Sequence, residues 1–397
     1  MKLLYFTTLI SAFAALCAHA EIKTPAIFSD GMMLQQNYAR LWGTSEPNAK
    51  VEIEICGNKS SVVADEKGKW MIPIGTPNGS FEPHEVKIYE NSKLAKTFSN
   101  VLFGEIWIAG GQSNMDFSLK GVEGSEEYIK SASGSNVRYF LEGGSSNKMF
   151  SAEGIGKNPE TEFPEGSSWI IPSPKNAGRL QGIPYIFAAE LSKKIRMPVG
   201  IIYTGTSGTR MAAWVSRQTY NTSPFFEKER KTMVKGAVLF KRIPLSLCPS
   251  KLKTLEMVQQ LIQWLHFIKK AKAEGKEPPP AWTVAPFLAP WPDSPDKWST
   301  PSMLFNLRIN PLRGYSARGT IWYQGESDSY DGFSEKFEGL INEWRSVFIS
   351  PHMPFLFVQL PSWTCVNWEY MRWDQFRTCK ELKNVGMAVA IDTGLED

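Results

Sequence analysis

The chain has 397 residues, of which 42% are hydrophobic and 21% charged. It is therefore long enough for two domains of ordinary size and apolar enough to build a real core. Its formal net charge is only +4, and no block of Lys and Arg stands out. Binding to nucleic acid has no electrostatic support in such a sequence.

The first 20 residues have the pattern of a secretory signal peptide. Lys2 gives a short basic start, Leu3 to Leu16 is apolar, and Ala18-His19-Ala20 has the small residues of a cleavage site. Leu16 is larger than the residue that lipid-anchor processing favours before a cysteine such as Cys17, so a released protein is expected. No later apolar run reaches the roughly 20 residues of a membrane-spanning helix. We expect an exported protein, periplasmic or extracellular, without stable membrane insertion.

Four cysteines follow this segment: Cys56, Cys248, Cys365 and Cys379. They show no Cys-x-x-Cys spacing, so the sequence gives no support for a zinc site. Four cysteines can be joined into two disulfides in three different ways. A disulfide between Cys365 and Cys379 and a set of free thiols are both left open.

Residues 21–100 have the pattern of an all-β region. Lys50–Ile55 and Val86–Tyr89 alternate in polarity, and turn residues such as Gly57-Asn58 punctuate the runs. Strands at such short spacing predict a small β-sandwich, which we interpret as an accessory domain.

Residues 101–397 alternate strands with helices, the pattern of an α/β fold whose parallel sheet has helices on both faces. The predicted strands are Glu105–Ala109, Val199–Thr204, Gly319–Tyr323, Phe355–Leu360 and Met387–Ile391. The predicted helices are Pro184–Ile195, Ser334–Phe348 and Tyr370–Leu382.

An insertion of different texture covers about residues 216–302. Apolar residues from Leu252 to Ile268 predict one long amphipathic helix, and a stretch rich in Pro and Trp follows it. Trp282, Trp291 and Trp298 could stack on a sugar ring or pack within a loop.

The segment from Gly104 to Met115 is the centre of the chemistry. Ile106 to Ala109 is a short apolar run that suits a strand buried on both faces. Gly110-Gly111 then lets the backbone turn sharply. Ser113 lies just beyond this turn, where open α/β sheets place their ligands.

Two further segments accompany this serine: Ser207-Gly208-Thr209-Arg210 with Trp214, and Trp322 to Asp328. Together with Gly111-Gln112-Ser113-Asn114-Met115 they resemble the signature segments of the sialate O-acetylesterase family, within the SGNH-type serine esterases. The resemblance extends from about Ile27 to the last residue. It implies an SGNH-hydrolase-like (flavodoxin-like) fold, an acetylated sugar as substrate, and no cofactor or metal.

The resemblance also assigns roles to residues. Ser113 would be the nucleophile, and the backbone N–H groups of Ser113 and Gly208 with the side-chain amide of Gln324 would hold the oxyanion. Glu326 would shape the pocket and bind the catalytic loop. Arg210 could contact the carboxylate of an acidic sugar, or it could equally be a surface residue.

Two local alternatives remain open at this point. Glu326 and Asp328 could act as the carboxylate pair of a glycoside hydrolase. Asp116 could position Arg210 or cap a helix. The segment Gly104–Gly111 has neither the Lys of a P-loop nor the glycine spacing of a dinucleotide site, so nucleotide binding is not expected.

A serine nucleophile needs a base, usually a histidine oriented by a carboxylate. After the signal peptide the chain has only His84, His266 and His352, and none is placed to serve Ser113. In the resembling family, the last strand leads into a loop with an acidic residue and then His-Pro. Asp392 to Asp397 corresponds to the start of that loop, so we expect Asp397 as the orienting carboxylate, with Asp392 as the alternative, and a chain truncated before its histidine.

The sequence thus predicts an exported serine esterase that removes O-acetyl groups from sialic acid or related sugars. An acetyl xylan esterase of the same fold and a glycan-binding protein with an incomplete catalytic site are the alternatives. Because the histidine is not present, the activity of residues 1–397 is left open.

Overall fold

The computed structural model describes residues 21–132, 136–143, 159–227, 266, 269–271, 273–275, 300–328, 332–362 and 368–391. The predicted signal peptide, most of the predicted helix from Leu252 to Ile268, the three tryptophans of the insertion, and residues 392–397 lie outside these residues. Cys248 and Cys365 also lie outside them, and the described Cys56 and Cys379 carry free thiols.

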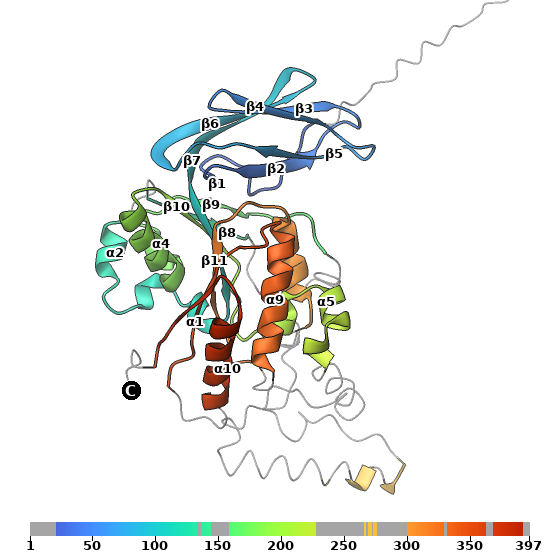
Figure 1. Cartoon of the computed structure of the whole chain (residues 1–397), viewed down its shortest axis with the longest axis vertical. Helices are drawn as coiled ribbons and strands as arrows, with labels where there is room; N and C mark the ends of the chain where they lie inside the picture. Colours follow the sequence, from blue (N-terminus) through green and yellow to red (C-terminus); the bar gives the residue numbers. More distant parts are fainter. Residues whose placement is uncertain are drawn as a thin grey trace, which may run out of the picture.

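The regular elements of residues 33–111 are all strands; β2 to β6 lie in the upper part of Figure 1, and β7 runs from there into the part below. Their burial alternates along β3, because successive side chains of a strand point to opposite faces. β2 pairs with β5, β3 with β4 and β6, and β6 with β7, all antiparallel. The bounds are β1 (Met33–Gln35), β2 (Ala39–Thr44), β3 (Lys50–Ile55), β4 (Asn58–Val63), β5 (Lys69–Ile74), β6 (Ser80–Glu90) and β7 (Lys93–Gly111).

A central sheet with the strand order β13-β12-β11-β7-β10-β8-β9 follows. Its neighbours are parallel except for the pair β8 and β9. This confirms the predicted mixed α/β class with a mostly parallel sheet. The further strands are β8 (Val137–Leu141), β9 (Ser168–Ile170), β10 (Val199–Tyr203), β11 (Gly319–Tyr323), β12 (Phe355–Val358) and β13 (Val385–Ala388).

Strand β7 belongs to both groups of strands. Its first half pairs with β6, and its second half lies between β10 and β11. Asn100 lies between the two halves with a left-handed φ of 55°, and its Oδ1 accepts a hydrogen bond of 2.9 Å from Nη2 of the buried Arg138. The expected domain boundary between residues 100 and 101 therefore lies inside a continuous strand.

Helices cover both faces of the central sheet (Figure 1). Trp107 of β7 contacts Phe187 of α4, with ring centroids 5.1 Å apart. The partner of Trp107 on β11 is Gly319. Trp322 lies three residues after Gly319, so it points to the opposite face, where it contacts Trp344 of α9 with ring centroids 5.4 Å apart. The helices are α1 (Ser113–Asp116), α2 (Glu126–Lys130), α4 (Gly182–Ile195), α5 (Arg217–Thr222), α9 (Phe333–Val347) and α10 (Trp368–Glu381).

Short helical turns complete the described elements. They are the 3₁₀ helices η1 (Leu119–Gly121), η2 (Ala177–Arg179), η3 (Met211–Trp214), η4 (Pro224–Phe226) and η9 (Asn310–Leu312), and the π-helix η8 (Phe305–Ile309). In the part of the chain that the structure describes, no helix has both the length and the apolarity to cross a bilayer.

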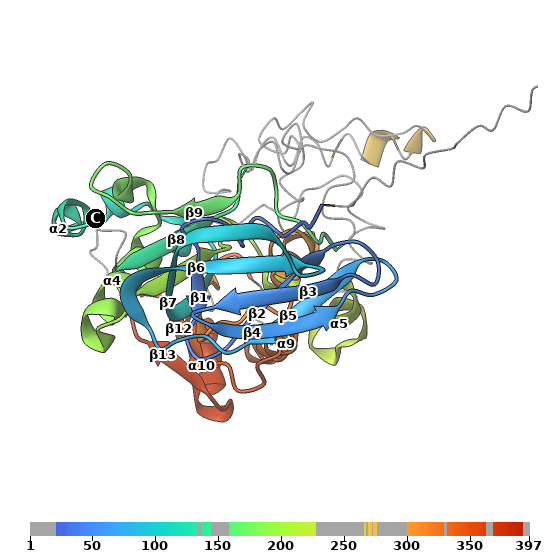
Figure 2. The ribbon, with the colours of Figure 1, turned by 90° about the horizontal axis from the view of Figure 1, so that it is seen from above.

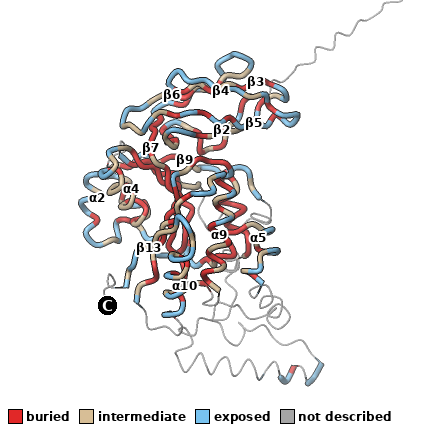
Figure 3. Tube along the Cα trace, viewed as in Figure 1, coloured by how far each residue is buried: buried red, intermediate tan, exposed pale blue. Residues whose placement is uncertain are grey.

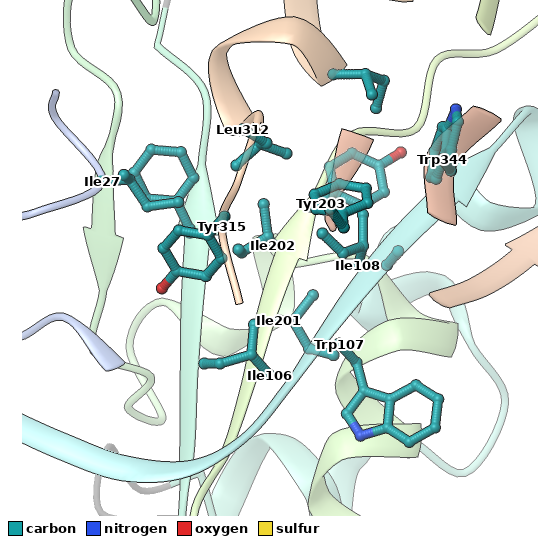
Figure 4. Packing of buried hydrophobic residues seen from close by; sticks show 14 of the residues in the cluster. Ile27, Ile106, Trp107, Ile108, Ile201, Ile202, Tyr203, Leu312, Tyr315 and Trp344 are labelled. Atoms are coloured by element: carbon teal, nitrogen blue, oxygen red, sulfur yellow. The ribbon is translucent and has the colours of Figure 1, made fainter. Parts of the chain in front are cut away.

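The core runs along the strands of the central sheet, as the red segments of Figure 3 show. Ile106 and Ile108 of β7 lie beside Ile201 and Ile202 of β10 (Figure 4). The core continues into the N-terminal strands, which face the viewer in Figure 2. There the Tyr315 hydroxyl donates a 2.7 Å hydrogen bond to the carbonyl of Met33.

Candidate active site

Ser113 is the first residue of α1 and is exposed at the carboxyl end of β7. The turn before it needs a glycine. Gly111 has φ +131°, and a Cβ at this position would lie 2.1 Å from the carbonyl oxygen of Tyr323 on the neighbouring strand. The next N–H, that of Gln112, donates to the same oxygen at 2.9 Å. The serine is thus presented on a backbone held against β11.

The side chain of Gln112 holds this turn through contacts with Ser113 and Ser327. The side chain is buried, its Nε2 lies 3.4 Å from Ser113 Oγ, and its Oε1 accepts from the Ser327 N–H at 3.2 Å. The sequence reasoning did not assign Gln112 a role. The available signal was a polar side chain at the end of an apolar strand, immediately before the serine.

The segment after β10 comes next to the serine. Gly208 is exposed with φ +73°, and no atom lies within 4 Å of the position where its Cβ would be. Asp116, on the same helical turn as Ser113, accepts hydrogen bonds from the Tyr203 hydroxyl at 2.7 Å and from Ser207 Oγ at 2.8 Å. Asp116 therefore has neither of its two expected roles: its carboxylate is not bonded to Arg210, and it does not cap a helix.

A buried ion pair supports this segment from behind. Arg308 Nη1 donates to the carbonyls of Thr204 and Gly205 at 3.2 and 3.1 Å, and its Nε lies 3.2 Å from Glu142 Oε2. Burial raises the pKa of Glu142 to about 7, although the Arg308 charge works in the opposite direction.

The segment after β11 carries Gln324, which is only 1% exposed. Its Nε2 donates to the Thr209 carbonyl at 3.3 Å and to Asp328 Oδ2 at 3.1 Å. A flipped amide would place its oxygen against two acceptors, so this orientation is fixed by its neighbours. The two amide hydrogens therefore point into the protein. The sequence had led us to expect that they point toward a substrate oxygen.

Asp328 is the buried centre of this segment. It accepts from Lys336 Nζ at 2.6 Å and from the Met211 N–H at 2.7 Å, in addition to Gln324. Burial by itself would raise the pKa of Asp328, but Lys336 and these hydrogen bonds outweigh it and lower the pKa. A carboxylate held in this way is not available as the second acid of a glycoside hydrolase.

Glu326 stands beside the serine turn. Its Oε1 accepts a 2.6 Å hydrogen bond from Asn114 Nδ2, and burial raises the pKa of its carboxyl. Its Oε2 is buried without a hydrogen-bond partner among the described atoms. This oxygen can accept a hydrogen bond from a ligand that reaches it.

Arg210 follows the Gly208 segment and is half-buried. Among the described residues its guanidinium makes no hydrogen bond or ion pair. It therefore offers up to five N–H donors in a planar arrangement that suits a carboxylate.

The structure brings Ser113, Gly208, Arg210, Gln324 and Glu326 to one edge of the sheet, at the carboxyl ends of β7, β10 and β11. The expected acid, Asp397, lies outside the described residues, as does Asp392.

The described histidines lie elsewhere. The Nδ1 of His84 is 3.3 Å from Cys56 Sγ in the N-terminal strands, and His266 and His352 are exposed. Within the described ranges no imidazole is hydrogen-bonded to Ser113, and no group of three or more metal-ligating side chains occurs.

Comparisons with known proteins extend the resemblance. Residues 294–397 match the family described as "Carbohydrate esterase, sialic acid-specific acetylesterase". The sialate O-acetylesterase of Mus musculus is 25% identical over 97% of this chain and 70% of its own length. That of Homo sapiens is 23% identical over 92% of this chain and 64% of its own length.

A solved structure supports the fold. The crystal structure of a carbohydrate acetylesterase from Xanthomonas citri covers 94% of this chain and 70% of its own, with a TM-score of 0.68 and 23% identity. The matched C-terminal region and the relatives that align along nearly the whole chain agree with the three signature segments, and together they support the resemblance of the chain to the sialate O-acetylesterase family.

Proposed function

We propose that this protein is an exported serine esterase that removes O-acetyl groups from sialic acid or related acetylated sugars. The observation that carries the proposal is the exposed Ser113 at the end of β7, between the segments that follow β10 and β11. In this proposal the α/β part is an SGNH-type esterase domain. Residues 1–20 are its signal peptide, and residues 21–100 form an accessory all-β unit.

The reaction begins with attack of Ser113 Oγ on the acetyl carbonyl. The negative charge that develops on the carbonyl oxygen is held by the N–H groups of Ser113 and Gly208, and each such donor lowers the barrier by about 3 kcal/mol. Gln324 does not contact the oxyanion in this proposal. Its amide donates a hydrogen bond to the carbonyl of Thr209, the residue after Gly208. We therefore assign Gln324 a positioning role in place of direct contact with the oxyanion.

The mechanism is of the Ser-His-Asp type. The family resemblance puts the histidine in a His-Pro after the loop that begins at Asp392, with Asp397 as its orienting carboxylate. We propose that the base is supplied from beyond Asp397. The support is that the three histidines after the signal peptide do not contact Ser113.

Two side chains account for recognition of an acidic sugar. The guanidinium of Arg210, which has no hydrogen-bond or ion-pair partner among the described residues, binds the carboxylate, because such a charge-assisted pair can form two parallel hydrogen bonds. The free Oε2 of Glu326 accepts a hydrogen bond from a sugar hydroxyl.

The test of catalysis measures acetate released from O-acetylated sialic acid by residues 1–397, with and without free imidazole. We expect release to rise with imidazole and to disappear in Ser113→Ala. The variant Ser131→Ala, which removes an exposed hydroxyl at the C-cap of α2, is the matched control. Equal release by the Ser113→Ala variant would contradict the proposal. Retention of the acetylated glycan without any Ser113-dependent release would favour the glycan-binding alternative.

The test of substrate class compares Arg210→Met with Arg217→Met, since Arg217 is an exposed arginine on α5. Losing a charged hydrogen bond costs about 1.5–3 kcal/mol. We therefore expect KM for O-acetylated sialic acid to rise about 10–100-fold in the Arg210 variant only. KM for acetylated xylan, which offers no sialic acid carboxylate, should not change. A similar rise for both substrates would remove Arg210 as the carboxylate ligand.

A further inference from the structure

The carboxylate of Asp116 joins two segments that are far apart in the sequence. It lies on the α1 turn that starts at Ser113, and its two oxygens accept from Tyr203 and from Ser207 at 2.7 and 2.8 Å. Tyr203 is the buried last residue of β10, and Ser207 is the exposed neighbour of Gly208.

The backbone around Gly208 is fixed at both ends. Before it, the Thr206 N–H donates to the Gly111 carbonyl at 3.0 Å, and Arg308 binds the carbonyls of Thr204 and Gly205. After it, the Thr209 carbonyl accepts from Gln324. Around the Cβ position of Gly208 itself there is open space within 4 Å. The hydrogen bond from Ser207 to Asp116 is a side-chain contact that ties the middle of the segment to the serine turn.

We infer that Asp116 is a positioning residue for the esterase reaction: through Ser207 it sets the place of the Gly208 N–H relative to the Ser113 N–H. The inference rests on the proposed function, since those two groups are its oxyanion donors. Donors of this kind stabilise the charge only when they are fixed in place before it develops. A displacement of about 1 Å at a reacting centre can lower the rate on the order of 100-fold.

The variant Ser207→Ala isolates this link. It removes the hydrogen bond to Asp116 Oδ2, leaves the bond to Tyr203 intact, and changes an exposed side chain, so the fold is preserved. With residues 1–397 and a fixed concentration of imidazole, we expect kcat for acetate release to fall about 10–100-fold with KM changed less than about twofold. Ser207→Thr, which keeps the hydroxyl, should restore most of kcat. Ser131→Ala should leave both parameters unchanged.

Hydrogen exchange gives a readout that does not depend on turnover. In Ser207→Ala, the amides of residues 206–209 should exchange faster, while those of β10 keep their wild-type rates. Wild-type kcat in Ser207→Ala, or unchanged exchange, would overturn the inference while leaving the proposed function in place. If the wild-type chain shows no Ser113-dependent release, the proposed function fails, and the positioning role fails with it.

Discussion

The ion pair between Lys336 and Asp328 allows a test of how burial determines the contribution of an ion pair to the free energy of unfolding. Lys336 Nζ lies 2.6 Å from Asp328 Oδ1, and the two side chains are 2% and 1% exposed. On α4, Lys193 Nζ lies at the same 2.6 Å from Glu190 Oε1, but these side chains are 63% and 43% exposed. Replacing each lysine with methionine removes one charge and keeps the length of the side chain and its helix propensity.

The two substitutions should differ strongly in effect. Lys336→Met leaves a buried carboxylate without its cation, which lowers the free energy of unfolding by about 3–5 kcal/mol. Lys193→Met should have a far smaller effect, because water already screens an exposed pair. Equilibrium unfolding in urea, followed by tryptophan fluorescence at pH 7, measures both.

The pH dependence gives a second check. The lowered pKa of Asp328 means that its ion pair adds stability above the pKa of the unfolded chain and loses it as the pH falls through the folded value. Without Lys336, burial raises the pKa of Asp328, and this carboxyl then takes up a proton on folding. The difference between wild type and Lys336→Met should therefore shrink as the pH falls toward about 4.

The reasoning is refuted if Lys336→Met unfolds at the same urea concentration as Lys193→Met at pH 7. It is also refuted if the difference from wild type stays constant down to low pH. The double variant Lys336→Met with Asp328→Asn should recover part of the lost stability, because it removes the uncompensated charge.

Two further predictions concern the supports of the site. Glu142→Gln should flatten the pH profile of stability. Burial raises the pKa of Glu142 from 4.5 to about 7 in spite of Arg308. The free energy of unfolding of the wild type should therefore fall by on the order of 3 kcal/mol as the pH rises through this range, and that of the variant should not. Urea denaturation at about pH 5 and 8 measures this, and an equal change in the two proteins would contradict it. Gly111→Ala should lower the free energy of unfolding by more than about 3 kcal/mol, since its Cβ would meet Tyr323 O at 2.1 Å. Gly57→Ala, at φ +81° with nothing within 4 Å, should cost only about 1–2 kcal/mol, and equal losses in the two variants would count against the clash.

The regular elements of the fold could be predicted where the hydrophobic pattern is local. The predicted strand Gly319–Tyr323 coincides with β11, and the apolar face of Ser334–Phe348 falls on α9, Phe333–Val347. Strand β13 begins two residues before its predicted start, since its ends are set by pairing with Phe355–Val358. That partner is distant in the sequence, so the local pattern does not encode the register.

Strands β8 and β9 were not predicted. β8 carries Arg138 in an otherwise apolar run, and a charged residue weakens the pattern of a buried strand. Its burial becomes understandable only with Asn100, whose amide oxygen binds the guanidinium from a strand 38 residues earlier.

The site could be predicted at the level of segments and not of side-chain directions. Ser113, Gly208 and Gln324 follow the strands that the sequence indicated, because parallel strands present their carboxyl ends at one edge. The orientation of Gln324 depends on Thr209, 115 residues away, and on Asp328, whose own partner Lys336 lies on the next helix. Such long-range polar contacts leave no mark on local spacing.

Strand β7 joins the N-terminal strands to the serine turn without an intervening loop. Its 19 residues form an unbroken path of about 60 Å from the N-terminal strands to the serine turn. Along this path Asn100 has a left-handed φ, and its side chain is hydrogen-bonded to the buried Arg138. A ligand held on the N-terminal strands and a substrate at Ser113 would therefore be connected by a single continuous strand.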